Sequence, residues 1–175
     1  MKRRIAIAIN LVLIIIAFTI QNCVFPLIPF LSAAPNLLLI LTFSFGFMNG
    51  QRAGMLYGVL AGVLLDLFYS GPFGFYTLFY VYVGYVNGIC NKYYYEEYIT
   101  LPLVLSILNE LAYNFYIYVL RFLFRGRLNV IYYIRELVIP ETIFTVVTTL
   151  LIYRLLLYIS RRLTEFENRR DNTIV

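Results

Sequence analysis

The sequence predicts an all-α polytopic membrane protein with about six transmembrane helices and almost no soluble part. Of its 175 residues, 62% are hydrophobic and 13% are charged, and the mean hydropathy is +0.80. A soluble domain has about 45–50% apolar and about 25% charged residues. The apolar residues form long runs, and a helix needs about 20 of them to cross the hydrocarbon core. An ordinary soluble domain is therefore excluded.

Six apolar stretches account for the predicted helices. They cover residues 5–20, 37–48, 53–69, 73–90, 99–124 and 138–159. The first follows a basic start, so a cleaved signal peptide is an alternative. We favour a retained helix, because residues 21–34 stay largely apolar and Pro35 would directly follow a cut after Ala34.

Local signals bound the later stretches. Pro35 precedes the second, and the fifth tolerates Pro102 in its first turn. The sixth is expected to stop at Arg161 and Arg162. This predicts a single six-helix transmembrane domain over residues 1–163 and a short polar cytoplasmic tail over residues 164–175.

Basic residues predict the orientation. With the N-terminus inside, the cytoplasmic face carries Lys2, Arg3, Arg4, Arg52, Lys92, Arg161, Arg162, Arg169 and Arg170. The outer face carries Arg125, Arg127 and Arg135. Nine against three favours both termini in the cytoplasm. The three outer arginines are on the disfavoured side, so they either meet a partner there or indicate a miscounted helix. Residues 21–36 and 126–137 read as interfacial segments.

Glycines recur in the third stretch. Gly54, Gly58 and Gly62 are four residues apart, with Asp66 at the next step. This spacing places them along one side of a helix and predicts a groove in which another helix approaches closely. The groove either packs a helix of the same chain or receives the transmembrane helix of a partner.

Five polar residues in the apolar stretches are considered next. Asp66 lies near the outer end of its helix, where it forms an ion pair with Arg121 or Arg125, caps the loop at 70–72, or has a functional role. Asn109, Glu110 and Asn114 place a polar cluster inside the fifth stretch, which is either functional or hydrogen-bonded within the bundle. Glu141 reads as a favourable charge at a helix N-terminus.

The residue inventory argues against an enzyme. The sequence has no histidine, which excludes a Ser-His-Asp triad and histidine metal sites. Both lysines lie at membrane edges, and no phosphate-binding Gly-Lys-Ser/Thr motif is present. We expect no cofactor, no metal and no nucleic acid.

One segment resembles a known family. Pro35 and Asn36 open the second helix, and Gly54, Gly58 and Gly62 lead into Leu64-Leu65-Asp66-Leu67. Gly71 and Gly74 follow, and Gly84 lies in the fourth helix. The order and spacing resemble the bacterial rod shape-determining protein MreD family, most specifically over residues 35–88.

The resemblance implies a role, a fold and partners. It implies a scaffold in the bacterial plasma membrane that binds an MreC-like single-pass protein and supports lateral peptidoglycan synthesis. MreB-like actin and RodA with its transpeptidase are implied as indirect partners; membrane lipid and a second copy of the chain are further expected contacts. The implied fold is similar to the substrate-binding subunit of energy-coupling-factor transporters. An alternative function is therefore a small-molecule-binding subunit of such a transporter.

Overall fold

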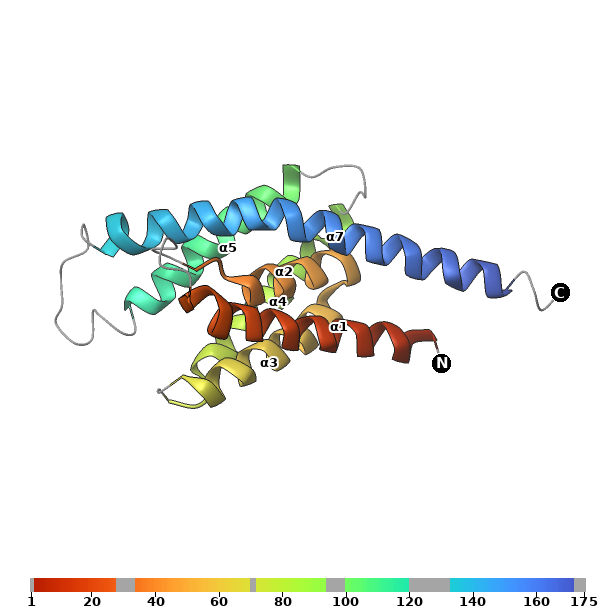
Figure 1. Ribbon diagram of the computed structural model, residues 1–175, viewed down its shortest axis with the longest axis horizontal. Helices are drawn as coiled ribbons and strands as arrows, with labels where there is room; N and C mark the ends of the chain where they lie inside the picture. Colours follow the sequence, from red (N-terminus) through yellow and green to blue (C-terminus); the bar gives the residue numbers. More distant parts are fainter. Residues whose placement is uncertain (1, 28–33, 70–71, 94–99, 120–132, 172–175) are drawn as a thin grey trace.

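The chain is a bundle of helices. A computed structural model describes residues 2–27, 34–69, 72–93, 100–119 and 133–171, with side chains between residues 7 and 159. In this part of the chain there are six α-helices and no strand (Figure 1). They are α1 (Lys2–Thr19), α2 (Leu37–Asn49), α3 (Gln51–Phe68), α4 (Phe75–Ile89), α5 (Thr100–Ile117) and α7 (Ile139–Asp171). The predicted all-α class is confirmed.

Three helical segments in the described residues are long and apolar enough to cross a membrane. They are Ile7–Leu27, Gln51–Phe68 and Ile134–Ile159, and the shorter Leu37–Asn49 is also apolar. The chain is therefore a helical membrane protein, as predicted. The number of crossings stays a prediction.

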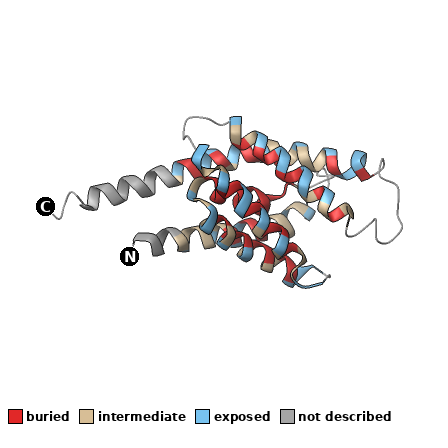
Figure 2. Ribbon diagram, turned by 180° about the vertical axis from the view of Figure 1, so that it is seen from behind, coloured by how far each residue is buried: buried red, intermediate tan, exposed pale blue. Residues whose placement is uncertain are grey.

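The shortest α-helix, α2, lies at the centre of the bundle. Every residue from Leu37 to Phe47 is buried, and α2 contacts α1, α3, α4, α5 and α7. Figure 2 shows buried residues gathered in the middle of the bundle and exposed ones on its outer helices. A helix that is apolar all round is stable where other helices or lipid surround it. Neighbouring helices surround α2 here, so it has little contact with lipid.

The helix ends differ from prediction at both ends of the chain. After α1, the π turn η1 (Ile20–Val24) and the 3-10 turn η2 (Phe25–Leu27) extend the helical backbone into the predicted interfacial segment. The last helix begins with the π turn η6 (Ile134–Val138) and continues to Asp171, so the helix does not end at Arg161 and Arg162 as expected. Its apolar span does end at Ile159, as predicted. Residues 160–171 contain no Pro or Gly and several strong helix formers, which explains the continuation.

The first helix belongs to the bundle. Ile14, Ala17 and Phe18 are buried in the core. The Asn10 amide donates to the Tyr57 hydroxyl at 2.9 Å. The Tyr69 hydroxyl donates to the Asn22 side chain at 2.7 Å. These contacts join the first helical segment to α3 and the residue that follows it.

Candidate functional site

The glycine groove of α3 holds α4 of the same chain. A Cβ atom added at Gly54 would overlap the Gly84 carbonyl, and one at Gly58 would overlap the Tyr80 carbonyl. At Gly62 it would overlap the backbone of Thr77. The sequence predicted that the groove holds either a helix of the same chain or a partner's helix, and in the structure it holds a helix of the same chain. No room is left on this side of α3 for a partner's helix.

Glycines of α4 and α2 complete the same close contact. A Cβ at Gly84 would overlap the Gly54 carbonyl. A Cβ at Gly46 would lie 2.7 Å from the Gly84 carbonyl oxygen, which is closer than a real Cβ approaches. The backbones of α2, α3 and α4 thus meet without side chains between them, and close packing of this kind stabilises helix association in lipid.

Asp66 caps the N-terminus of α4. Its Oδ1 accepts a hydrogen bond from Tyr76 N at 2.9 Å. Its Oδ2 accepts from Gly74 N and Thr77 N, both at 3.0 Å, and from the Thr77 hydroxyl. These bonds satisfy N–H groups that a helix start leaves without intrahelical partners, and a negative charge is favourable there. Asp66 itself is only 8% exposed.

Of the alternatives that the sequence left open for Asp66, the structure shows a cap, and its donors lie at the start of α4, just after the predicted loop at 70–72. Both carboxylate oxygens of Asp66 face the start of α4, where Gly74 is the N-cap residue and has a left-handed backbone conformation (φ +96°). The ion-pair alternative named Arg121 and Arg125, which lie outside the described residues, as does Gly71.

Asn36 joins three helices. It is 2% exposed, and its Oδ1 accepts from Leu39 N at 3.2 Å as the N-cap of α2. The same oxygen accepts from the Tyr80 hydroxyl of α4 at 2.9 Å. Its own N–H donates to the Thr145 hydroxyl of α7 at 3.1 Å. Pro35 directly precedes it and is also buried. The motif position Asn36 is therefore used for internal packing.

Two buried amides pair across α4 and α5. The Asn87 amide donates to Asn109 Oδ1 at 2.8 Å, and the Asn109 amide donates back to Asn87 Oδ1 at 3.0 Å. Each amide also donates to the carbonyl four residues earlier in its own helix. Asn109, predicted as part of one polar cluster with Glu110 and Asn114, thus has a separate partner.

Glu110 and Asn114 face α7. Glu110 is 0% exposed, and the Asn114 amide donates to its Oε1 at 3.3 Å. The carboxyl of Glu141, on α7, lies close enough to Glu110 to interact electrostatically. Because η6 leads directly into α7, Glu141 lies inside a continuous helical segment. It packs beside Glu110 as well as lying in the first turn of α7.

A signal for this contact was present in the sequence. Ser106, Glu110 and Asn114 are four residues apart on α5, and Glu141, Thr145 and Thr149 are four apart on α7. Such spacing lines up polar groups on one helix face. The two polar faces meet in antiparallel order, and the Ser106 and Thr149 hydroxyls are hydrogen-bonded at 2.8 Å.

An apolar hollow lies on the outer side of α3, α4 and α5. Its volume is about 430 Å³, and its lining is apolar. We call it the tyrosine hollow; it is lined by Met55, Leu78, Phe79, Val81, Tyr82, Tyr85 and Tyr116. Tyr82 is 65% exposed and Tyr85 is 41% exposed. Sequence reasoning missed this surface, because it depends on which sides of three helices remain uncovered.

Comparison with known proteins identifies one family. The family model for the rod shape-determining protein MreD matches residues 1–161. No curated protein matches the chain. No solved structure matches it, so the expected similarity to energy-coupling-factor subunits stays a prediction.

Proposed function

The chain belongs to the rod shape-determining protein MreD family, and from this premise we propose that it is a non-catalytic membrane scaffold of the elongation machinery. Family membership gives it a role in rod shape determination. The proposal adds that it binds an MreC-like single-pass protein in the bacterial plasma membrane and so supports lateral peptidoglycan synthesis. MreB-like actin and RodA with its transpeptidase act in the same assembly.

The residue inventory supports a non-catalytic role. The sequence has no histidine, and both of its lysines lie outside the apolar stretches. Asp66, Asn87 and Asn109, three of the buried polar groups, bond to other groups of the bundle. Buried polar groups used in this way join helices together in lipid.

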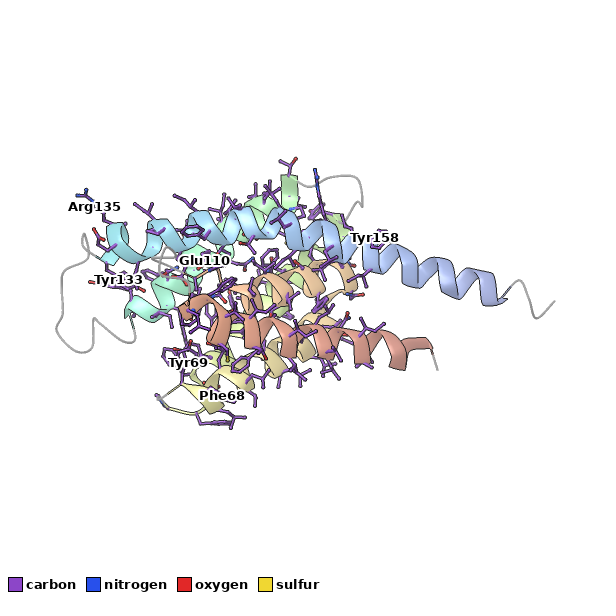
Figure 3. The ribbon with its side chains drawn as sticks, viewed as in Figure 1. Phe68, Tyr69, Glu110, Tyr133, Arg135 and Tyr158 are labelled. Atoms are coloured by element: carbon purple, nitrogen blue, oxygen red, sulfur yellow. The ribbon has the colours of Figure 1, made fainter. Side chains whose placement is uncertain are left out.

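We propose six crossings with both termini in the cytoplasm. The excess of basic residues on the proposed inner face favours this orientation. The start of α1 and the end of α7 lie at the same end of the bundle, which is the arrangement that an even number of crossings produces (Figure 1). Tyr69, Tyr133 and Arg135 lie at the opposite end, which becomes the outer side (Figure 3).

The observation that carries the proposed partner binding is the position of Tyr82 in the tyrosine hollow. Tyr82 is the central residue of the 15-residue α4, which places it near the middle of the bilayer. Its side chain is 65% exposed, and no described residue hydrogen-bonds to its hydroxyl. Tyrosines that face lipid are normally at the membrane interfaces, where water and headgroups satisfy the hydroxyl.

A partner's transmembrane helix satisfies the Tyr82 hydroxyl where acyl chains do not. Acyl chains offer no hydrogen-bond acceptor, and leaving a hydroxyl unpaired in an apolar medium costs a few kcal/mol, about 1–3 by protein mutational data. A helix seated in the tyrosine hollow would fill its apolar surface and could supply an oxygen from a Ser, Thr or Asn side chain. We therefore place the MreC-like partner's helix here and not in the glycine groove, which α4 fills.

Co-purification of the MreC-like partner tests this surface. Tyr82→Ala should reduce recovered partner at least about tenfold, because about 1.4 kcal/mol of lost binding is a factor of ten. Tyr82→Phe should give a smaller loss, because it removes only the hydroxyl. Leu151→Ala on α7, where the side chain is 70% exposed, is the matched control on another surface.

Two results would oppose the assignment. Full partner recovery by Tyr82→Ala, at normal levels of membrane-inserted protein, would remove the tyrosine hollow as the binding surface. Equal losses in Tyr82→Ala and Leu151→Ala would show a general effect of apolar surface and not a specific one. In either case the family role in rod shape would be unaffected, because it rests on the family match.

A further inference from the structure

A row of polar side chains joins α5 to α7 inside the bundle. In antiparallel order the facing pairs are Ser106 with Thr149, Glu110 with Thr145, and Asn114 with Glu141. Figure 3 shows Glu110 in the interior beside α7, toward the end of the bundle that carries Tyr133. Glu110 has no exposed surface, and Glu141 is partly exposed. The row therefore brings two acids from different helices into one buried interface.

The two carboxyl groups hydrogen-bond to each other. Glu110 and Glu141 belong to neighbouring pairs of the row, and each carboxyl is a hydrogen-bond partner of the other. An ionised carboxylate can only accept hydrogen bonds, whereas a protonated carboxyl can also donate one. Two ionised carboxylates therefore cannot bond to each other. The bond requires a proton on one of the two acids.

The surrounding donors are too few to satisfy two ionised carboxylates. A side-chain amide has two protons to donate, and a hydroxyl has one. The Asn114 amide donates to Oε1 of Glu110 at 3.3 Å and also bonds to Glu141. The Thr145 hydroxyl lies beside the Glu110 carboxyl and accepts from Asn36 N at 3.1 Å. Oε2 of Glu110 is buried and accepts from no amide that the structure describes, so a carboxyl proton is the donor that suits it.

No basic side chain in the described part of the chain faces the two acids. The other titratable groups around them are tyrosines, namely Tyr80 on α4, Tyr113 on α5 and Tyr133 before η6, and α2 carries no titratable residue. Tyrosine is neutral below about pH 9, so these groups supply no positive charge. The described residues also contain no group of three acidic, Cys or His side chains that could hold a metal ion. A buried carboxylate without such a partner is neutralised by a proton.

We infer that Glu110 and Glu141 form a proton-binding site, in which one shared proton bridges the two carboxyls and holds α7 against α5. Loss of this proton leaves two negative charges side by side in an apolar interior, which weakens the interface. Glu141 is partly exposed and gives protons a route between the site and the medium. None of these residues lines the tyrosine hollow, so the inference does not depend on the proposed partner.

Thermal unfolding of the purified full-length protein in detergent tests the site. The unfolding temperature is measured by circular dichroism from about pH 5.5 to about pH 8.5, where glutamates of the unfolded chain have lost their protons. The folded protein then binds one proton more than the unfolded chain, so its stability falls as the pH rises. The unfolding temperature of wild type should decrease by about 3–5 °C per pH unit for as long as the folded protein keeps the shared proton.

Glu110→Gln separates the shared proton from the hydrogen bond that it makes. The glutamine amide has nearly the size of the carboxyl, and its NH₂ group can donate to an ionised Glu141 without a titratable proton. This variant should therefore fold, and its unfolding temperature should lose the decrease of 3–5 °C per pH unit that wild type shows, written as about 0 °C per pH unit. Glu136→Gln, at an exposed position in η6, is the matched control and should keep the decrease.

Infrared spectroscopy gives a readout that does not depend on unfolding. The C=O stretch of a protonated carboxyl is separate from the bands of ionised carboxylates. At about pH 6 exposed acids are ionised, so a protonated-carboxyl band reports a buried acid. Wild type and Glu136→Gln should show this band, and Glu110→Gln should lack it. The band should disappear at the pH where the decrease in unfolding temperature ends.

Two outcomes overturn the inference. If wild type unfolds at one temperature throughout this pH range and shows no protonated-carboxyl band, both acids are ionised and share no proton. This result needs no variant, so a Glu110→Gln protein that fails to fold does not weaken the test. If Glu110→Gln keeps both the pH dependence and the band, the proton binds elsewhere in the protein.

Discussion

The cap that Asp66 makes on α4 gives the most quantitative prediction. Asp66→Asn keeps only one of the two oxygens. The amide should turn so that this oxygen holds the Oδ2 position, where it still accepts from Gly74 N and Thr77 N. The NH₂ group then stands at the Oδ1 position and cannot accept from Tyr76 N. A hydrogen bond to a charged group contributes about 1.5–3 kcal/mol, and the lost charge at the start of α4 adds about 0.3–1 kcal/mol. The expected decrease in the free energy of unfolding is about 2–4 kcal/mol.

The assay is thermal unfolding in detergent followed by circular dichroism, because the chain has no tryptophan for intrinsic fluorescence. For a chain of this length each kcal/mol corresponds to about 2–4 °C, so Asp66→Asn should lower the unfolding temperature by roughly 4–16 °C. Thr77→Val removes only the hydroxyl bond to Oδ2 and should cost about 1 kcal/mol.

The order of the two effects decides whether the reasoning is right. An Asp66→Asn protein that unfolds within about 2 °C of wild type would refute the claim that the carboxylate stabilises the start of α4. Equal shifts for Asp66→Asn and Thr77→Val would mean that the backbone bonds contribute nothing beyond the hydroxyl. In cells, the destabilised Asp66→Asn protein should be present at a lower level and should fail to restore rod shape.

Other positions should respond in proportion to their contacts. Gly58→Ala should cost about 1–3 kcal/mol, because its methyl group overlaps the Tyr80 carbonyl. The methyl group of Gly74→Ala would contact no other atom, so this variant should cost only the strain of its positive φ, about 1–2 kcal/mol. If Gly58→Ala unfolded at the wild-type temperature, that result would contradict the close contact of α3 and α4. Asn87→Ala and Asn109→Ala in a double-mutant cycle should show a coupling of about 0.6 kcal/mol, at most about 1.7, and a coupling of zero would argue against their reciprocal bonds.

Part of the candidate site could be read from residue types and spacing. The four-residue steps of Gly54, Gly58 and Gly62 predicted a close helix contact, and the contact exists with α4 as the second helix. Spacing along one helix says which residues share a side, but not which helix faces that side. The predicted partner groove was therefore one of two outcomes that the sequence could not separate.

Asp66 and Glu110 show the same limit for polar residues. A carboxyl inside an apolar stretch predicts that some group satisfies it, because burial without a partner is costly. In both cases the partner lies on another helix: Asp66 bonds to the start of α4, and Glu110 faces Glu141 of α7. The polar spacing on α5 and α7 is compatible with this contact, but the sequence of α5 by itself does not specify which helix its polar side meets.

The sequence alone determined the class of the protein and the approximate extent of its helices, since both follow from the lengths of apolar runs and from Pro, Gly and charge at their ends. The tertiary structure decided which helix fills the glycine groove, which donors meet Asp66 and which surfaces remain exposed. The physical reason is that apolar run length is a local property of the chain. The rotation and pairing of helices depend on packing between residues far apart in sequence.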